Sequence, residues 1–509
     1  MGAMSGRLLS LPLVVILMGL SAFAMYLPAA HAAVTRDFEV MRAFFQSANL
    51  LLVLTAMIAI ATANRRVAQP ERSYLLALLA AFAGLPVFLA VPFAISVPDT
   101  VFLNAYVEMV SALTTTGASL YPDPARLPES VHLWRALVGW LGGLLMLVAA
   151  MAIFAPMNLG GFEVLSGAGG RRAGIASAED GARRLRRAAA RLVPVYAGLT
   201  FVLWVGLLLA GDRPLVAVSH AMSVLSTSGI SPVGGLSGGQ SGFWGELLIF
   251  AMLFFAVTRQ GLHREQAGRG AGRLLSDPEL RLAVLIVVAV SLLLFLRHWI
   301  GALEVAQTGA AQASPLRQGL AALWGGLFTV LSFLTTTGFE SGAWGAARQW
   351  SGLETPGLIL MGLALVGGGV ATTAGGVRLL RVYALYKHGM REMERLVHPS
   401  SVGGAGSAAR RLRRQGAQVA WVFFMLFVLS LTATVLLFTL NGEDFATALT
   451  LAVAGLSTTG PVLQAAAETP IDLGALSGFS RLTFAGAMVL GRLEMLVIIA
   501  LLAPDFWRQ

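Results

Sequence analysis

The feature of this sequence that most constrains its fold is a Thr/Ser-rich turn ending in glycine, which occurs four times. Each turn follows an apolar segment of roughly a dozen residues, which is too short to cross a bilayer. The short segments are 102–113, 214–225, 319–334 and 444–456. The turns that follow them are Thr114-Thr115-Thr116-Gly117, Ser226-Thr227-Ser228-Gly229, Thr335-Thr336-Thr337-Gly338 and Ser457-Thr458-Thr459-Gly460. A period of about 115 residues predicts one structural unit that is used four times.

Longer apolar stretches surround these segments, and each is long enough to cross a bilayer, which takes about 20 residues. The chain is 56% hydrophobic and 12% charged, whereas soluble domains carry about 25% charged residues. The ten predicted crossings are 8–29, 43–63, 73–97, 132–156, 191–211, 242–258, 281–302, 354–380, 415–440 and 478–504. We therefore expect an all-α, multi-pass membrane protein with four pseudo-symmetric helix–pore loop–helix repeats around a central pore, plus two N-terminal helices.

The domain organisation follows from the same pattern. Two N-terminal helices precede the first repeat, and basic cytoplasmic segments separate the later repeats. The predicted parts are the N-terminal helices at 1–70, pore repeat 1 at 71–160, a basic linker at 161–190, repeat 2 at 191–260, a loop at 261–280, repeat 3 at 281–381, a basic linker at 382–414 and repeat 4 at 415–509.

Basic residues are concentrated in alternate loops of the chain. The formal net charge is +10, and the arginines that carry it lie mostly at 65–72, 171–191, 259–273 and 391–414. This positive-inside pattern places those loops in the cytoplasm, and an even number of crossings then places both termini there. The basic charge indicates topology in the plasma (inner) membrane and argues against a nucleic-acid partner. Because the chain has no cysteine, disulfides and thiolate metal sites are excluded.

The first apolar stretch allows two interpretations. Its basic start, apolar core and Ala30-His31-Ala32 triplet resemble a signal peptide that is cleaved near residue 32. The apolar run is long for a signal peptide, and we therefore favour a retained helix.

Four non-spanning loops that enter the membrane from one side indicate a pore. Irregular backbone at membrane depth is tolerated where protein buries it or where it lines a watery cavity. Carbonyl groups turned toward a common axis can replace the hydration shell of K⁺, and glycine reaches the backbone angles that this requires. Threonine hydroxyls can pair with neighbouring backbone groups or add an oxygen ligand. The predicted filter residues are Thr115, Thr116, Gly117, Thr227, Ser228, Gly229, Thr336, Thr337, Gly338, Thr458, Thr459 and Gly460, with K⁺ bound at Thr115, Thr227, Thr336 and Thr458.

Several motifs outside the turns carry a family resemblance. They are Leu133-Trp134-Arg135, Trp140-Leu141-Gly142-Gly143, the glycine-rich run 367–376 followed by Val377-Arg378, Gly491-Arg492-Leu493-Glu494, and Pro504-Asp505-Phe506-Trp507-Arg508. With the four turns, they make the chain similar, over nearly its whole length, to the Trk/Ktr/HKT potassium transporters and, among them, to the TrkH-like bacterial members. The resemblance implies K⁺ uptake, four pseudo-equivalent units, homodimers, and K⁺ as the transported ion with no organic cofactor in this chain.

The resemblance also bears on ion selectivity and on partners. In this family a glycine in every filter turn goes with K⁺ preference, and all four turns here contain it. The second turn departs from the family pattern at Ser228, which leaves a Na⁺-permeable or weakly selective transporter as the alternative. The family implies a cytoplasmic ring of nucleotide-binding, RCK-type regulatory subunits. The basic loops are candidate contacts for that ring, although mixed charges of this kind are also typical of solvated segments.

The glycine-rich run in the third repeat interrupts an otherwise apolar crossing. Small residues commonly serve close helix packing in membranes, but five glycines within ten residues predict a break in the helix. By resemblance, this run is an intramembrane gating loop below the filter, and Arg492 is a pore-facing cation that interacts with it. The candidate gating residues are Gly367, Gly368, Gly369, Thr372, Thr373, Gly375, Gly376 and Arg492.

Three further polar residues lie near the turns. We expect Glu108 and His220 to tie the first and second pore helices to their neighbours, and Glu340 to attract cations at the outer mouth or to be simply solvated. A polytopic membrane enzyme is the distant alternative. It would need clustered His, Asp or Glu at membrane depth, whereas the seven histidines are scattered, so we expect no enzymatic activity.

Overall fold

The computed structural model describes residues 12–62, 70–157, 159, 161, 178–258, 277–307, 315–351, 357–398, 407–467 and 469–493. Regular structure in these ranges is entirely helical, which confirms the predicted all-α class. Seven helical stretches are long and apolar enough to cross a membrane: Leu13–Val34, Phe38–Thr62, Arg72–Ser96, Glu129–Met157, Gly181–Leu209, Pro278–Arg297 and Gly416–Leu440. They coincide with seven of the ten predicted crossings.

The other three predicted crossings are shorter helices in the described part of the chain. The crossing expected at 242–258 is α13 (Gly242–Leu253), which a single 3₁₀ turn extends to Ala256. The crossing expected at 354–380 is the shorter helix α18 (Gly357–Val366), which ends directly before the glycine-rich run. The last is α23 (Gly478–Leu493), and the rest of its predicted span, with Glu494 and the 504–508 motif, lies outside the described residues.

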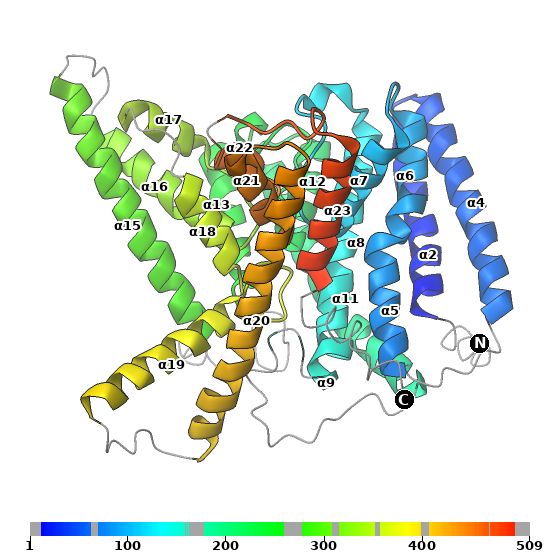
Figure 1. Cartoon of the computed structure of the whole chain (residues 1–509). Coiled ribbons are helices and arrows are strands. Elements are labelled where there is room, and N and C mark those ends of the chain that lie inside the picture. The colour runs from blue at the N-terminus through cyan, green and yellow to red at the C-terminus, as the bar shows by residue number, and fades with distance from the viewer. Residues whose placement is uncertain are drawn as a thin grey trace.

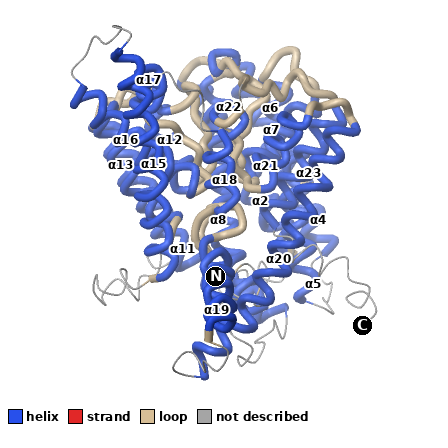
Figure 2. The backbone as a smooth tube through the Cα atoms, turned by 60° about the vertical axis from the view of Figure 1, so that its left-hand side comes forward, coloured by secondary structure: helices blue, strands red, loops and turns tan. Residues whose placement is uncertain are grey.

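Each of the four repeats contains a pore helix that ends at a filter turn. The pore helices are α7 (Phe102–Leu113), α12 (Pro214–Ser226), α16 (Pro315–Leu334) and α21 (Phe445–Leu456). Helix α16 has 20 residues and so begins earlier than the predicted segment 319–334. Their last turns are buried, and the loops that continue from them run through the interior of the helix bundle (Figure 2).

The remaining helices surround these four. They are α5 (Pro70–Ala83), α6 (Leu85–Ser96), α8 (Glu129–Ala149), which continues through a π turn into α9 (Ala155–Met157), α11 (Ala178–Leu209), α15 (Pro278–Gln307), α17 (Gly342–Ser351), α19 (Leu379–Val397), α20 (Ser407–Leu440) and the short α22 (Val462–Ala465). Helix α19 and the first turns of α20 extend beyond the bundle at its lower end in Figure 1, opposite the filter turns.

Two N-terminal elements pack against the first repeat. They are the paired helices α2 (Leu13–Ala24) and α3 (Tyr26–Val34), and α4 (Phe38–Thr62). His31 Nδ1 lies 2.8 Å from Ser130 Oγ of α8, and the rings of Phe44 and Trp134 meet edge to face at 5.7 Å. The candidate cleavage triplet lies inside α3, where Ala32 is fully buried. The first span therefore lies against the first repeat as a pair of helices.

Candidate functional site

The four filter turns share one backbone geometry, which ends each pore helix. The third residue of every turn donates its amide to the carbonyl five positions earlier, at 2.8 to 2.9 Å. The second residue has left-handed backbone angles, as in a Schellman cap. These residues are Thr115 (φ 57°), Thr227 (φ 54°), Thr336 (φ 59°) and Thr458 (φ 54°). A β-branched residue held there costs about 1–3 kcal/mol, and a strained conformation repeated in all four units points to a functional constraint.

The turns also form a closed ring. A Cβ atom built on each turn glycine would lie less than 3.0 Å from an atom of the next turn or of the residue directly after that turn. The contacts run from Gly117 to Ser228, from Gly229 to Thr337, from Gly338 to Pro461, and from Gly460 to Ala118. The order is therefore repeat 1 to 2 to 3 to 4 and back to 1. The amide of Gly460 also donates a 2.6 Å hydrogen bond to the carbonyl of Thr116, which joins the last turn to the first.

The reason for glycine differs in the fourth turn. Gly117, Gly229 and Gly338 have φ of 73°, 65° and 79°, as the sequence-based argument from backbone angles expected. Gly460 is not among the glycines with positive φ, so for this turn that argument is wrong. What requires glycine here is space, because a Cβ would collide with backbone atoms of Gly117 and Ala118.

The four threonine hydroxyls proposed as K⁺ ligands have different surroundings. Thr227 Oγ1 donates to its neighbour Ser226 O at 2.7 Å, and Thr336 Oγ1 accepts from the amide of Gly375 at 2.9 Å. Thr115 Oγ1 and Thr458 Oγ1 are buried without a hydrogen-bond partner in the described part of the chain. Buried polar atoms are normally paired, and an unpaired one calls for an explanation such as a bound ion. These two hydroxyls are therefore suited to coordinating a cation.

In three repeats, one polar side chain of the pore helix is hydrogen-bonded to the chain segment that follows the turn glycine. The pore-helix residue nine positions before the turn glycine is Glu108, His220, Thr329 or Leu451. Glu108 accepts from Ser119 Oγ and from the amide of Leu120, both at 3.0 Å, and His220 Nε2 lies 2.9 Å from Ser231 Oγ. Thr329 Oγ1 accepts from the amide of Ser341 at 3.4 Å. In the fourth repeat the position is an apolar leucine, and the short helix α22 follows the filter instead.

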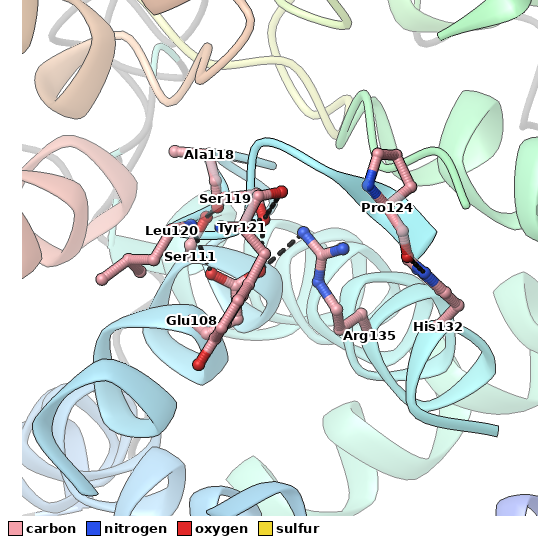
Figure 3. A network of polar contacts seen from close by, with 9 residues as sticks. All are labelled: Glu108, Ser111, Ala118, Ser119, Leu120, Tyr121, Pro124, His132 and Arg135. Carbon is pink, nitrogen blue, oxygen red and sulfur yellow. Dashed lines mark hydrogen bonds and ion pairs between the residues drawn. The ribbon is translucent and has the colours of Figure 1, made fainter. Parts of the chain in front are cut away.

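The Glu108 side chain of the first repeat also forms an ion pair. Figure 3 shows Arg135 of α8 reaching Glu108, with Arg135 Nη2 2.6 Å from Glu108 Oε1. Both side chains are buried, at 5% and 1% exposure. A buried pair of this kind holds two helices in one relative position, because removal of either partner leaves an uncompensated charge. The contacts of Glu108 and His220 thus agree with the structural roles expected for them.

The glycine-rich run forms a buried loop directly against the filter. Helix α18 ends at Val366 and α19 begins at Leu379. Besides the Thr336–Gly375 bond, Thr373 Oγ1 donates to the carbonyl of Leu225 at 3.1 Å. Gly375 also packs so closely on Ser457 and Thr458 that a Cβ would not fit. The loop therefore touches the pore-helix ends or filter turns of repeats 2, 3 and 4.

The other candidate gating residues shape or hold this loop. Gly367 and Gly376 have positive φ, 74° and 77°, and a Cβ on Gly368 or Gly369 would collide with neighbouring backbone. Thr372 Oγ1 donates to the carbonyl of Gly369 at 2.7 Å. Arg492, which is 2% exposed, donates from Nη1 to the carbonyl of Thr373 at 2.6 Å. Thus Arg492 contacts the loop, as the resemblance implied.

Sequence inspection missed several polar contacts that support the site. Val370 of the loop donates its amide to buried Glu279 Oε1 at 2.8 Å, and buried Arg381 stacks over the Phe423 ring at 3.6 Å. Glu246 of α13 accepts from Ser341 Oγ and from the amide of Gly342, both at 2.7 Å. A charge at the end of an apolar segment was the available signal for all three, but it is shared by many solvated residues.

An outer vestibule of about 440 Å³ lies above the ring. The four turn glycines line it, together with His132, Arg135, Glu340, Arg348 and Gln464. Burial raises the pKa of the Glu340 carboxyl, and Arg348 partly opposes that shift. Glu340 is therefore a vestibule-lining carboxyl whose charged form is disfavoured by burial.

Comparisons with known proteins agree with this arrangement. The family described as TrkH, cation transport protein, matches residues 248–508. The chain is 29% identical to a Trk system potassium uptake protein TrkH of Halomonas elongata, over 85% of this chain and 84% of that protein. It is 26% identical to the TrkH of Escherichia coli, over 95% and 96%. The crystal structure of the potassium transporter TrkH from Vibrio parahaemolyticus superimposes with a TM-score of 0.80 at 25% identity, covering 98% of this chain and 99% of that one.

Proposed function

The chain belongs to the TrkH family of cation transport proteins, and from this premise we propose that it takes up K⁺ across the membrane. The single observation that carries the proposal is the closed ring of four filter turns, in which each glycine lies against the next turn. The family is one of transporters, and K⁺ is the transported ion rather than a resident cofactor. No organic cofactor is needed for this function.

We propose that the ring is the selectivity filter, formed by the threonine and glycine residues of the four turns. Two buried threonine hydroxyls without a partner in the described chain support K⁺ coordination at this level. The pore helices end at the turns, so the negative ends of their dipoles favour a cation there. The carbonyl and hydroxyl oxygens of the turns replace the water molecules around K⁺ as the ion enters from the vestibule.

We further propose that the glycine-rich loop is the gate and that Arg492 stabilises its closed position. The hydrogen bonds of the loop to Thr336 and from Arg492 support this, since they hold the loop directly against the filter. A positive charge at this depth raises the barrier for a cation that has passed the filter. Opening requires the loop to leave these partners.

The finer assignments extend the same proposal. The protein lies in the inner (plasma) membrane with both termini in the cytoplasm, forms a homodimer, and docks an RCK-type nucleotide-binding ring. The positive-inside distribution of arginine supports this orientation. The extension of α19 and α20 beyond the bundle at the end opposite the filter offers a surface for the ring (Figure 1). We also propose the division of the chain into two N-terminal helices, four pore repeats and the cytoplasmic segments between them, with the bounds given in the sequence analysis.

The test is ion competition in liposomes that contain the purified full-length protein. Radioactive rubidium uptake is measured with added K⁺ or Na⁺ in wild type, Gly117→Ser and Gly362→Ser. Gly362 is the control, because a Cβ there meets nothing within 4 Å. We expect K⁺ but not Na⁺ to compete in wild type and Gly362→Ser, and Na⁺ to compete in Gly117→Ser. Equal competition by both ions in wild type would contradict K⁺ selectivity and favour the weakly selective alternative.

A further inference from the structure

A second cavity lies away from the pore, between the N-terminal helix α2, helices of the first repeat and the first half of α11. Its volume is about 300 Å³, and residues of α2, α5, α6, α7, α8 and α11 line it. Fourteen of its seventeen lining residues are apolar, among them Leu17, Leu20, Leu144 and Val193. An apolar cavity of this size does not hold ordered water, which needs polar partners. In a bilayer the matching occupant is hydrocarbon.

One residue that lines the cavity is basic, and further arginines are close to it in the sequence. Arg186 of α11 is one of its lining residues, and the same stretch of α11 also carries Arg183, Arg184, Arg187 and Arg191. Tyr74 lines the cavity as well, packed against Gly181. The positive-inside rule places this arginine-rich start of α11 at the cytoplasmic leaflet. Basic pockets between membrane helices on that side are suited to anionic lipid headgroups.

We propose that this cavity binds one acyl chain of an anionic phospholipid from the cytoplasmic leaflet, with the lipid phosphate at Arg186. The apolar walls fit the chain, and the guanidinium complements the headgroup charge. A soluble metabolite is disfavoured, because the walls offer it few hydrogen-bond partners.

The inner wall of the cavity connects the lipid to the filter. Leu113 lines the cavity and is the last residue of α7, directly before the first filter turn. The backbone of Leu113 also lies so close to Gly142 of α8 that a Cβ on Gly142 would not fit. An acyl chain in the cavity therefore packs against Leu113, the residue directly before the first filter turn.

The experiment measures lipid retention by the intact purified protein and does not depend on its transport activity. The delipidated protein is titrated with phosphatidylglycerol or phosphatidylcholine, and bound lipids are counted by native mass spectrometry. Two matched pairs of variants are compared. Arg186→Gln removes the charge that lines the cavity, and Arg187→Gln removes the same charge from an exposed neighbour that is not among the lining residues. Val193→Trp fills the cavity, and Val202→Trp adds the same bulk to an exposed site on α11 outside it.

We expect wild type to retain one phosphatidylglycerol in preference to phosphatidylcholine. Arg186→Gln weakens that binding about fivefold, the effect of one arginine near an anionic surface, and Val193→Trp abolishes it. Both control variants behave as wild type. Equal retention of the two lipids by wild type, or equal loss in Arg186→Gln and Arg187→Gln, would overturn the proposal. If Val193→Trp fails to fold, as judged by circular dichroism, the comparison of Arg186→Gln with Arg187→Gln still tests the proposal.

Discussion

The hydroxyl of Thr336 accepts a 2.9 Å hydrogen bond from the amide of Gly375, so the third filter turn and the glycine-rich loop are directly joined. The other three turn threonines have different environments, although all four share the same strained backbone. The four turns thus share a left-handed threonine, whereas only three of them have a glycine with positive φ, and their side-chain contacts differ. If the turns form the filter and the glycine-rich loop forms the gate, as we propose, an ion ligand and a gate contact occupy equivalent positions of different repeats.

Thr336→Val tests this contact. Valine keeps the shape and the β-branch but leaves the buried Gly375 amide without its acceptor, which costs about 1–3 kcal/mol. We expect a lower thermal unfolding temperature than in Thr115→Val, which removes an equivalent hydroxyl that has no partner in the described chain. Equal destabilisation of the two variants would show that the hydroxyl does not hold the loop.

Arg492→Gln is expected to raise cation flux. It removes a buried charge and weakens the bond to Thr373 O, which Arg492 makes at 2.6 Å. At an effective dielectric of ~20 and a separation of ~10 Å, a unit charge contributes about 1.7 kcal/mol to the barrier, more than tenfold in rate. Initial rates of rubidium uptake measure this. Arg492→Lys keeps the charge and should stay near wild type, so similar gains in both variants would exclude the electrostatic explanation.

The Glu108–Arg135 pair predicts non-additive effects on stability. Glu108→Gln leaves the guanidinium of Arg135 buried and unpaired, which costs about 3–5 kcal/mol. The double variant Glu108→Gln/Arg135→Met should recover much of that loss, because no lone charge remains. Unfolding of wild type, Glu108→Gln, Arg135→Met and the double variant in the same detergent gives the coupling energy. Simple additivity of the two changes would show that the 2.6 Å pair contributes little.

Glu340 predicts a dependence on external pH. Burial raises its pKa, so the carboxylate charge is present above the raised pKa and is lost as the external pH falls through it. We expect rubidium uptake by wild type to fall in that window, and uptake by Glu340→Gln to be lower at neutral pH and flat through the same window. Asp123→Asn, a change at an exposed outer carboxylate, should keep the wild-type profile. An unchanged profile in Glu340→Gln would assign the titration to another group.

The stability of the folded protein should also depend on the ionisation of Glu340, but in the opposite direction: uptake is expected to fall as the pH falls, whereas stability is expected to rise. A raised folded-state pKa means that the ionised carboxylate is disfavoured in the folded protein. This cost is fully present above the raised pKa, shrinks as the pH falls through it and is gone below the pKa of the unfolded chain. Glu340→Gln should therefore unfold at a higher temperature than wild type at neutral pH, and this difference should shrink as the pH falls. A difference that is independent of pH would indicate a packing effect.

The sequence by itself determined the class of the protein, most of its crossings and the positions of the four turns that we propose as the filter. Bilayer crossing depends on local runs of apolar residues, and the charge bias of loops is equally local. The short pore segments, the four turns and the helix break at Gly367 were recognisable for the same reason. The contact of Arg492 with the loop was expected from family resemblance and not from spacing.

Tertiary structure alone decided which groups meet. The pairing of Glu108 with Arg135, the bond between Thr336 and Gly375 and the cavity beneath Leu113 join segments whose separation in the chain carries no period or pattern. Packing also decided why glycine is required at position 460: a side chain would not fit there, whereas the backbone angle is not unusual. Local hydropathy specifies where a helix lies in the membrane, whereas close contacts between repeats depend on the shapes of all the helices together.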